Sequence, residues 1–462
     1  MKIRRFLAAL LAALLTMGAT GEASAVTWLE ADTVADRFVA NPRNVKDIGD
    51  PYVLVENGAY HVFATGGPLG FFHWGSDDLV SFERTKALQK AKWASGDYWA
   101  PEVYAWQGRY VMFYTARWKE NGGLRIGVAF ADQVEGPYED ALDAPLFDPG
   151  YAVIDGSLYV DDGVPYLLFV RDCSDNVVNG VHESHVYGVR LADDLLSIAG
   201  EPVRLTQPDA AWETTSADWR WNEGPFVVKH DGRYYLYYSV NHFQDKAYSV
   251  GVAVADAILG PYVKQANNPI LTYVEQDGKV IVSGPGHNAL FMVGDELFTS
   301  YHTHTYPLAP SGNRQLCIDR AGFHKDGTAY IDGPTLAGQL RPLGEMGLVN
   351  HMASALCAED PDGLLTDGDT CQAASSAAYV FQGETAVFTW QNPVTADLLL
   401  LYPALGAPVA GTVSIDGESL DFALSPALPG EALILPFESQ AVSELRVTLS
   451  EGRLGEVMLI GQ

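Results

Sequence analysis

The sequence predicts an all-β chain, a five-bladed β-propeller followed by a small β-sandwich, and three observations support this. Five segments share a glycine followed by an aromatic-rich strand, and the glycines are Gly58, Gly108, Gly163, Gly232 and Gly294. A short apolar strand precedes each glycine, so each segment is expected to be a β-hairpin with a tight turn. No stretch between the repeats has the apolar spacing of an amphipathic helix.

Residues 1–25 have the features of a secretory signal peptide. Lys2, Arg4 and Arg5 form a basic start, an apolar run follows, and residues 23–25 read Ala-Ser-Ala. This order predicts cleavage and export, and therefore a secreted or periplasmic protein. The apolar run is short for a membrane span, and no membrane insertion is expected.

The chain is strongly acidic. It has 29 Lys and Arg against 58 Asp and Glu, a formal net charge of −29 at pH 7. Such a surface repels nucleic-acid phosphates and anionic membranes, so nucleic acid is not an expected partner. Apolar residues make up 48% and charged residues 19%, which indicates a packed protein. Nothing in the sequence indicates an oligomeric state.

The chain has four cysteines, and an even number permits disulfides in an exported protein. Cys357 and Cys371 bracket a short loop and are expected to pair. Cys173 and Cys317 either pair or remain buried thiols. The absence of a Cys-x-x-Cys motif argues against a cysteine-based metal site.

The repeats place the propeller at residues 26–343. Their glycines are 50 to 69 residues apart, and three or four strands in each repeat are typical of propeller blades. A β-sandwich would have shorter spacing and no self-similarity.

Beyond residue 343 the aromatic residues thin out, and short alternating strands predict a β-sandwich over 344–462. Its "LTDGD" loop and terminal "LRVTLS…GEVMLIG" resemble the discoidin or galactose-binding-like family. The resemblance implies a domain that either binds carbohydrate or braces the propeller.

Three acidic residues precede first strands at equivalent positions of their repeats: Asp50 in the first, Asp155 in the third and Glu223 in the fourth. The innermost strands of a propeller start at one end of its channel, so these carboxylates are expected to converge on one cavity. Each residue alone is more often structural, because Asp-Pro and Asp-Gly are ordinary turn elements. Together they predict one raised pKa, and thus a protonated acid beside an ionised base. Acetal hydrolysis needs that pair.

The chain resembles family 43 of the glycoside hydrolases over nearly all of residues 45–330. The resemblance rests on "DIGDPYVL", "YWAPEVYAWQGRYVMFYTA", "IDGSLYVDDGVPYLLF", "EGPFVVKHDGRYYLYYS" and "SGPGHNALF". It implies a five-bladed propeller that cleaves α-L-arabinofuranosyl or β-D-xylosyl linkages with inversion. It also implies that Asp50 is the general base, Glu223 the general acid, and Asp155 the carboxylate that orients and tunes the acid.

The resemblance extends to a histidine and an arginine. His287 matches a family histidine that lies on the propeller axis beside a bound cation, often calcium, although an interblade hydrogen bond explains it equally well. Calcium prefers oxygen ligands, so waters would have to complete its shell. Arg314 matches a family arginine that reaches the pocket, and otherwise it is a surface ion pair.

Other residues are candidates on chemical grounds. Trp99 and Trp221 are candidate walls for sugar stacking, because apolar sugar faces suit aromatic rings, although tryptophan is equally a core residue. His302 and His304 share one face of a strand. They fit core or pocket-lining roles better than a zinc site, because no third ligand is recognisable.

Two alternatives remain. A retaining fructan or sucrose hydrolase has the same layout but other nucleophile and acid motifs, and a non-catalytic propeller would bind sugars without cleaving them. The third repeat departs from the family in its "VDDGVPY" turn, and the long insert "LTQPDAAWETTSADWRW" follows it at residues 205–221. Such insertions line propeller pockets and usually decide the substrate, so neither the sugar nor endo or exo action is predicted.

Overall fold

The computed structural model describes residues 26–67, 70–89, 91–370, 381 and 384–462. The chain divides into two compact units, one of residues 41–334 and one in which residues 335–462 group with the N-terminal segment up to residue 40. The boundaries expected from the sequence were 26–343 and 344–462. Residues 26–40 group with the C-terminal unit because β1 (Phe38–Ala40) pairs with β27 (Gly338–Leu340).

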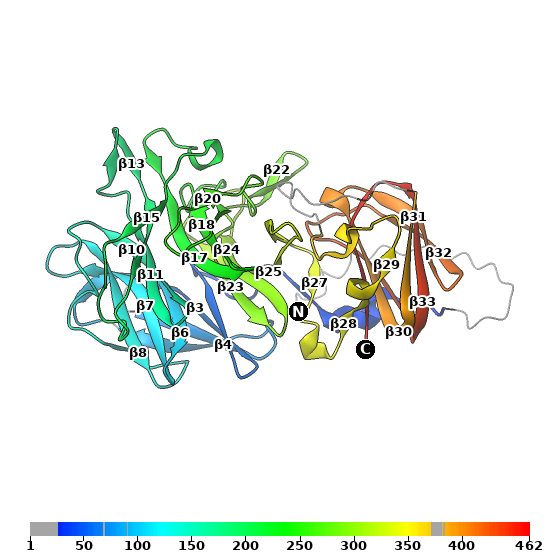
Figure 1. Ribbon diagram of the computed structural model, residues 1–462, viewed down its shortest axis with the longest axis horizontal. Coiled ribbons are helices and arrows are strands. Elements are labelled where there is room, and N and C mark those ends of the chain that lie inside the picture. The colour runs from blue at the N-terminus through cyan, green and yellow to red at the C-terminus, as the bar shows by residue number, and fades with distance from the viewer. Residues whose placement is uncertain (1–25, 68–69, 90, 371–380, 382–383) are drawn as a thin grey trace. The chain divides into compact units, whose positions relative to one another are not determined.

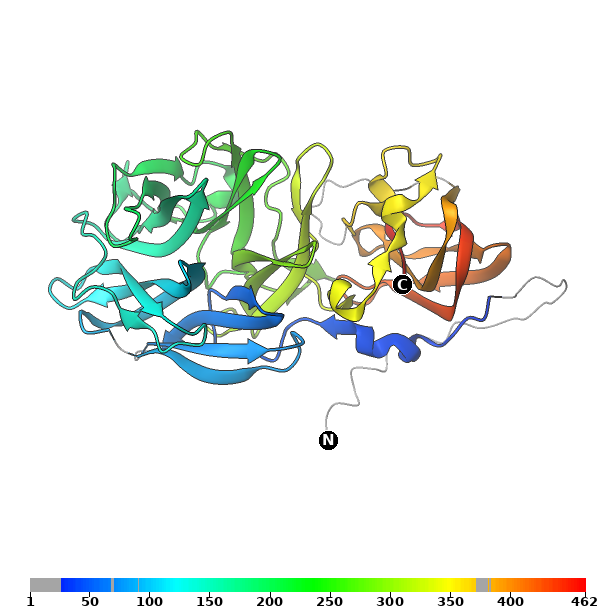
Figure 2. The same cartoon turned by 60° about the horizontal axis from the view of Figure 1, so that its bottom comes forward.

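Residues 41–334 contain five four-stranded antiparallel sheets, coloured blue to green in Figures 1 and 2. The first two sheets are β2 (Tyr52–Glu56), β3 (Ala59–Gly67), β4 (Gly70–Ser76), β5 (Glu83–Gln89), and β6 (Ala94–Trp106), β7 (Arg109–Trp118), β8 (Leu124–Ala131), β9 (Glu139–Asp140). The third is β10 (Val153–Asp161), β11 (Val164–Arg171), β14 (His185–Arg190), β15 (Val203–Thr206). The last two are β17 (Asn222–His230), β18 (Arg233–Val240), β19 (Ser249–Ala255), β20 (Val263–Lys264), and β23 (Gly286–Val293), β24 (Glu296–His304), β25 (Arg314–Phe323), β26 (Ala329–Ile331).

The five sheets close into a ring. The first strand of each sheet contacts the first strand of the next, in the order β2, β6, β10, β17, β23, and β23 contacts β2. Backbone bonds strengthen the closure, since the Arg43 N–H donates to Leu316 O at 2.8 Å and the Leu316 N–H donates to Val45 O at 3.0 Å. The predicted five-bladed propeller is confirmed, with each sheet as one blade.

The repeated glycines form the tight turns that the sequence predicts. In the first four blades the residue before the glycine also has positive φ, as at Asn57 (52°) and Gly58 (80°). Two positive φ angles in succession define a type I′ turn, which suits strand twist. In the fifth blade only Gly294 (62°) has positive φ. It occupies the first central position, where a type II′ turn requires glycine.

Two insertions extend the propeller. A three-stranded sheet contains β12 (Val177–Val178), β13 (Val181–Glu183) and β16 (Trp219–Arg220), and β21 (Val274–Gln276) pairs with β22 (Lys279–Val282) in a hairpin. β16 belongs to the long insert noted in the sequence, which also contains the short 3-10 helix η3 (Ala211–Glu213). It pairs in parallel with β13, so the insert is fixed to the loop that leaves the second strand of the third blade.

The C-terminal unit is a seven-stranded sheet with a 3-10 helix, η2 (Ala31–Arg37), from the N-terminal segment. Its strands are β28 (Val349–Asn350), β29 (Leu356–Cys357), β30 (Thr385–Pro403), β31 (Val409–Ile415), β32 (Glu418–Leu424), β33 (Leu433–Glu451) and β34 (Leu454–Gly461). Short 3-10 turns connect them: η4 (Gly344–Met346), η5 (His351–Ser354), η6 (Leu364–Thr366) and η7 (Ala404–Gly406).

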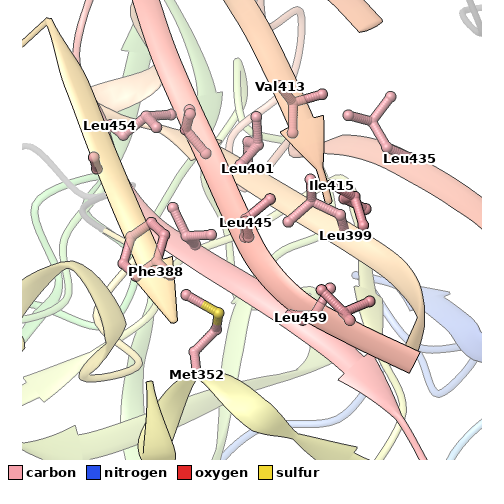
Figure 3. Close-up of a cluster of buried hydrophobic side chains, with 14 of the residues drawn as sticks. Met352, Phe388, Leu399, Leu401, Val413, Ile415, Leu435, Leu445, Leu454 and Leu459 are labelled. Atoms are coloured by element: carbon pink, nitrogen blue, oxygen red, sulfur yellow. The ribbon is translucent and has the colours of Figure 1, made fainter. Parts of the chain in front are cut away.

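Side-chain alternation along β30 gives this unit apolar residues on both faces. Leu399 and Leu401 point into the main core with Val413, Ile415 and Leu445, as Figure 3 shows. Leu398 and Leu400 point the other way, into a second cluster that contains Val34 of η2. Successive residues of a strand face opposite sides, so one leucine-rich segment holds both clusters together.

Cys173 and Cys317 do not pair with each other but remain buried thiols, which is one of the two alternatives expected from the sequence. Both are free and buried, and they lie on different blades, after β11 and within β25. Cys357 donates to Glu359 at 3.4 Å, and its expected partner, Cys371, lies outside the described residues, as does the predicted signal peptide. Within the described ranges no helix has the length and hydropathy to span a bilayer.

Candidate active site

Four of the five innermost strands, β6, β10, β17 and β23, have a β-bulge at the same end, and the segment before β2 has the same spacing, since the Thr65 N–H donates to Gly49 O at 2.8 Å while Tyr52 is opposite Phe63. In β17, Glu223 is opposite Ser239 and Phe226 is opposite Tyr237, so two residues on one strand face one on the other. β6, β10 and β23 have the same register shift. The first bulge residue has positive φ in every blade: Asp50 (53°), Ala100 (43°), Asp155 (56°), Gly224 (55°) and His287 (50°).

This register corrects one expectation. Asp50, Asp155 and His287 occupy equivalent positions, as predicted for the two aspartates, but the equivalent residue of the fourth blade is Gly224. Glu223 lies one residue earlier, at the position that Trp99 takes in the second blade. The expectation was wrong by one residue because a bulge leaves no mark in the sequence that fixes its register.

The bulges are joined by a ring of hydrogen bonds between blades. The N–H of each first bulge residue donates to a side chain of the preceding blade. The pairs are Ala100 to Thr65 Oγ1 at 3.0 Å, Asp155 to Thr115 Oγ1 at 2.9 Å, Gly224 to Asp155 Oδ2 at 3.0 Å, His287 to Ser239 Oγ at 2.7 Å, and Asp50 to His302 Nδ1 at 3.1 Å.

Asp155 replaces a missing acceptor in this ring. Four acceptors, Thr65, Thr115, Ser239 and His302, lie on second strands opposite the start of a bulge. In the third blade this position is Val170, whose side chain has no acceptor. The Asp155 carboxylate accepts the Gly224 N–H in its place, so it lies directly beside the Glu223 segment.

Asp50 is surrounded by the Arg314 cation, two imidazole rings and a hydroxyl donor. Arg314 Nη1 lies 2.9 Å from Asp50 Oδ1, His287 Nδ1 lies 3.2 Å from the same oxygen, and Thr65 donates to Oδ2. Burial alone would raise the pKa of Asp50, but Arg314, His287 and His302 together hold it well below its usual range. Asp50 is therefore ionised near neutral pH.

The pKa values of Glu223 and Asp155 are raised, in contrast to that of Asp50. Burial, then the charge of Asp155, raises the pKa of Glu223 well above its usual range, and the Asp50 charge adds to this. Burial, together with the Asp50 charge, raises the pKa of Asp155 to about 6, although His287 opposes the shift. Contacts connect the three carboxyls, because Asp155 accepts from the Gly224 N–H beside Glu223, and the His287 ring lies against Gly224 and 3.2 Å from Asp50. The site thus combines a carboxyl biased toward its ionised form, Asp50, with one biased toward its protonated form, Glu223.

Two site residues were not found from the sequence. Tyr248 donates its hydroxyl to Glu223 Oε1 at 2.8 Å and stacks on His302, with ring centroids 5.5 Å apart. Glu102 is a fourth buried carboxyl, bonded by Tyr104, and burial raises its pKa to about 8, with a contribution from Asp155. Tyr248 has no motif around it, whereas Glu102 lies in the "YWAPEV" motif.

The predicted aromatic residues lie at the same end of the propeller. Trp99 is half-buried at the position that matches Glu223, and it packs against the core between the third and fourth blades. Trp221, two residues before Glu223, is half-buried and contacts the His242 ring at 5.0 Å. Both keep part of their surface exposed, and Trp99 also packs against the core, so a role in binding a sugar stays a prediction for each.

The histidines do not build a metal site by themselves. His287 contacts Asp50, whose carboxylate is already paired with Arg314. His302 accepts from Asp50 N–H, and His304 bonds Ser283 Oγ at 2.8 Å and Phe243 O at 2.8 Å. Across the described part of the chain, no three His, Cys, Asp or Glu side chains are grouped to hold a metal ion.

The chain was compared with known proteins. The model of glycosyl hydrolases family 43 matches residues 39–329. A beta-D-galactofuranosidase from Aspergillus niger is 24% identical over 67% of this chain and 89% of its own length. An extracellular exo-alpha-(1->5)-L-arabinofuranosidase from Streptomyces avermitilis is 26% identical over 73% of this chain and 71% of its own.

Among solved structures, a thermostable family-43 glycoside hydrolase is 42% identical. It has a TM-score of 0.63 and covers 66% of this chain and 98% of its own. The family match covers more than half of the sequence and contains every candidate site residue. The chain therefore belongs to glycosyl hydrolases family 43 and is a glycoside hydrolase.

Proposed function

We propose that this glycoside hydrolase inverts the anomeric centre as it cleaves α-L-arabinofuranosyl or β-D-xylosyl linkages of plant-type polysaccharides or their fragments. The proposal depends on the opposite pKa shifts of two carboxyls in one site, downward for Asp50 and upward for Glu223. Asp50 is held ionised by Arg314, and Glu223 is held protonated by burial and by Asp155. A general base and a general acid need those states at one pH.

In this mechanism Glu223 donates its proton to the leaving glycosidic oxygen while the Asp50 carboxylate takes a proton from the attacking water. Water attacks the anomeric carbon from the face opposite the leaving group, so the product has inverted configuration. Asp155 does not transfer a proton. It accepts from Gly224 N–H, and its negative charge keeps the neighbouring Glu223 protonated.

The experiment uses Asp50→Asn and Glu223→Gln, which are close in shape to the native residues. Each is expected to reduce kcat on aryl α-L-arabinofuranosides and β-D-xylosides by at least roughly a hundredfold, the lower range of acid–base catalysis. An aryl β-D-galactofuranoside belongs in the panel because one relative has that activity in its name. If either variant keeps most of the activity, the assignment of roles fails.

Product stereochemistry separates this proposal from the retaining alternative. Proton NMR of the first-formed sugar reports its anomeric configuration before mutarotation. Inverted product supports Asp50 as a base that acts through water, whereas retained product would make Asp50 a nucleophile. Digestion of arabinan, arabinoxylan and xylo-oligosaccharides, with products separated by size, distinguishes endo from exo action.

A calcium ion beside His287 remains a proposal. The residues around this imidazole fit calcium poorly, because calcium prefers oxygen and the nearby Asp50 carboxylate is paired with Arg314. No catalytic step is derived from a cation. Loss of thermal stability on treatment with a chelator, restored by calcium, would support the site, and an unchanged melting temperature would argue against it.

Export and a role for the C-terminal unit are also proposed. The basic and apolar start of the sequence and the word extracellular in the name of one relative support export. N-terminal sequencing of the mature protein tests cleavage after Ala25. We propose a discoidin-type carbohydrate-binding role for residues 344–462, supported by their alternating strands, and glycan-array binding by a Glu223→Gln variant tests it.

A further inference from the structure

A continuous row of aromatic rings runs along the end of the propeller where the bulges lie. We call His182, Trp219, Trp221 and His242 the aromatic row. His182 stacks on Trp219 with centroids 3.9 Å apart and an angle of 11°. The Trp219 and Trp221 ring centroids are 6.5 Å apart with an interplanar angle of 19°, and the Trp221 and His242 centroids are 5.0 Å apart.

The two ends of the aromatic row lie on different parts of the chain. His182 and Trp219 belong to β13 and β16, whose parallel pairing places them opposite each other. β16 is part of the long insert between the third and fourth blades, and Trp221 directly follows it. His242 lies in the loop between β18 and β19. The insert therefore brings rings from two loops into one line.

This row is continuous with the catalytic groups. Trp221 lies two residues before Glu223. At the other end His242 contacts the Phe243 ring at 4.9 Å, and the Arg314 guanidinium lies over that ring at 4.9 Å. Arg314 in turn is paired with Asp50. A chain of contacts thus connects the base with the exposed insert, and the acid follows Trp221 by two residues.

The exposure of Trp219 distinguishes it from a tryptophan that only packs a core. Trp219 is 40% exposed, whereas a tryptophan that only stabilises a core buries most of its surface. His242 also lines a cavity of about 640 Å³ together with Gln244, Asp245, Lys246, Val280 and Leu308. Apolar faces beside amide and charged groups suit sugars, whose rings have an apolar face and a polar edge.

We propose that the aromatic row binds the sugar units of an extended glycan on one side of the cleaved bond. The inference rests on the proposed function and adds the surface that holds the units beyond the cleaved bond. The sugar at the catalytic carboxyls lies beside Trp221, and the following units stack along Trp219.

The test compares wild type with Trp219→Ala on arabino- and xylo-oligosaccharides of two to six units and on the matching aryl glycoside. We expect wild-type kcat/KM to rise with chain length. In Trp219→Ala the ratio of kcat/KM for the longest chain to that for the aryl glycoside should fall roughly fivefold, the size of one lost aromatic contact. Trp106→Ala, a half-buried tryptophan beside the β6–β7 turn, is the control and should leave this ratio unchanged.

An unchanged ratio in Trp219→Ala, or an equal loss on short and long substrates, would overturn the proposal. Binding separates this outcome from failure of the proposed function. Titration calorimetry measures the affinity of Glu223→Gln for the same oligosaccharides, with and without Trp219→Ala. It therefore tests binding by the aromatic row without turnover. Wild type that cleaves none of these glycans refutes the proposed function, whereas length-dependent affinity that Trp219→Ala does not weaken refutes the aromatic row.

Discussion

Arg314 Nη1 lies 2.9 Å from Asp50 Oδ1, and its guanidinium fills the space that a side chain at Gly49 would need. A β-carbon at Gly49 would come within 2.0 Å of the guanidinium carbon. The residue before the proposed base is therefore glycine because the cation that keeps this base ionised lies against the backbone.

Arg314→Met is expected to move the acidic limb of the kcat/KM profile to higher pH. Burial raises the pKa of Asp50, and Arg314 provides the largest opposing effect. Without it the pKa rises, so Asp50 becomes protonated at a higher pH and activity is lost there. The pH dependence of kcat/KM on an aryl glycoside measures the shift. Arg320 lies on the same strand as Arg314 and pairs with Glu296. The control Arg320→Met removes that pair and should leave the acidic limb in place.

Gly49→Ala should reproduce much of this effect without touching a charged residue. The methyl group displaces the guanidinium, so kcat/KM should fall and the acidic limb should move toward that of Arg314→Met. Gly200→Ala is the matched control, because Gly200 has open space and lies in the loop between β14 and β15. A fully active Gly49→Ala would show that Arg314 has freedom to move without loss.

Tyr248→Phe should move the basic limb to higher pH. Burial, followed by Asp155, raises the pKa of Glu223, and the Tyr248 hydroxyl lowers it by donating to the carboxylate. Without that bond the acid keeps its proton to a higher pH, while kcat falls by roughly tenfold or less. Tyr238→Phe removes a similar 2.8 Å bond to the buried Glu213. This control should leave the limb unmoved.

Asp155→Asn should move the same limb in the opposite direction. The amide oxygen still accepts the Gly224 N–H, but the negative charge that raises the pKa of Glu223 is gone. Glu223 then loses its proton at a lower pH, and activity at alkaline pH falls first. Asp155→Ala removes charge and hydrogen bond together and should lose more activity at every pH. Shifts of equal sign in Tyr248→Phe and Asp155→Asn would contradict this account.

Stability of the first blade should fall in mild acid. His61 Nδ1 and His73 Nε2 are 2.9 Å apart in the core of the blade, and burial lowers both pKa values, that of His73 to about 4. The unfolded histidines titrate near pH 6.5, so the unfolded state binds protons first as pH falls and the free energy of unfolding decreases between these values. Glu56, Asp77 and Glu135 oppose the shifts without reversing them.

Thermal unfolding from pH 7.5 to 4.5 measures this loss. His73→Gln should flatten the dependence on pH, because it removes the more strongly shifted group. His351→Gln, at a half-buried histidine of the C-terminal unit that bonds Thr395 O, should not. Equal slopes in all three proteins would exclude the pair as the cause.

The sequence predicted the propeller because its turns repeat, and it predicted the three carboxyls because each lies near the start of a first strand, although Asp155 and Glu223 lie inside β10 and β17 and not before them. It misplaced Glu223 by one residue, since the bulge register depends on the partner strand. Tyr248 could not be predicted, because it reaches Glu223 from the residue before the third strand of the same blade without a local signal. The Gly224–Asp155 bond depends on Val170 in place of a hydroxyl, which has meaning only once the blades are aligned.

The ring of hydrogen bonds between blades makes the catalytic geometry a property of the whole circle. Asp50 is positioned by the fifth blade, His287 by the fourth and Asp155 by the second. Unfolding of any blade would break this ring of hydrogen bonds and displace the acid and the base. Catalytic competence should therefore disappear in step with opening of the circle, and hydrolysis itself becomes a sensitive gauge of whether the propeller is closed.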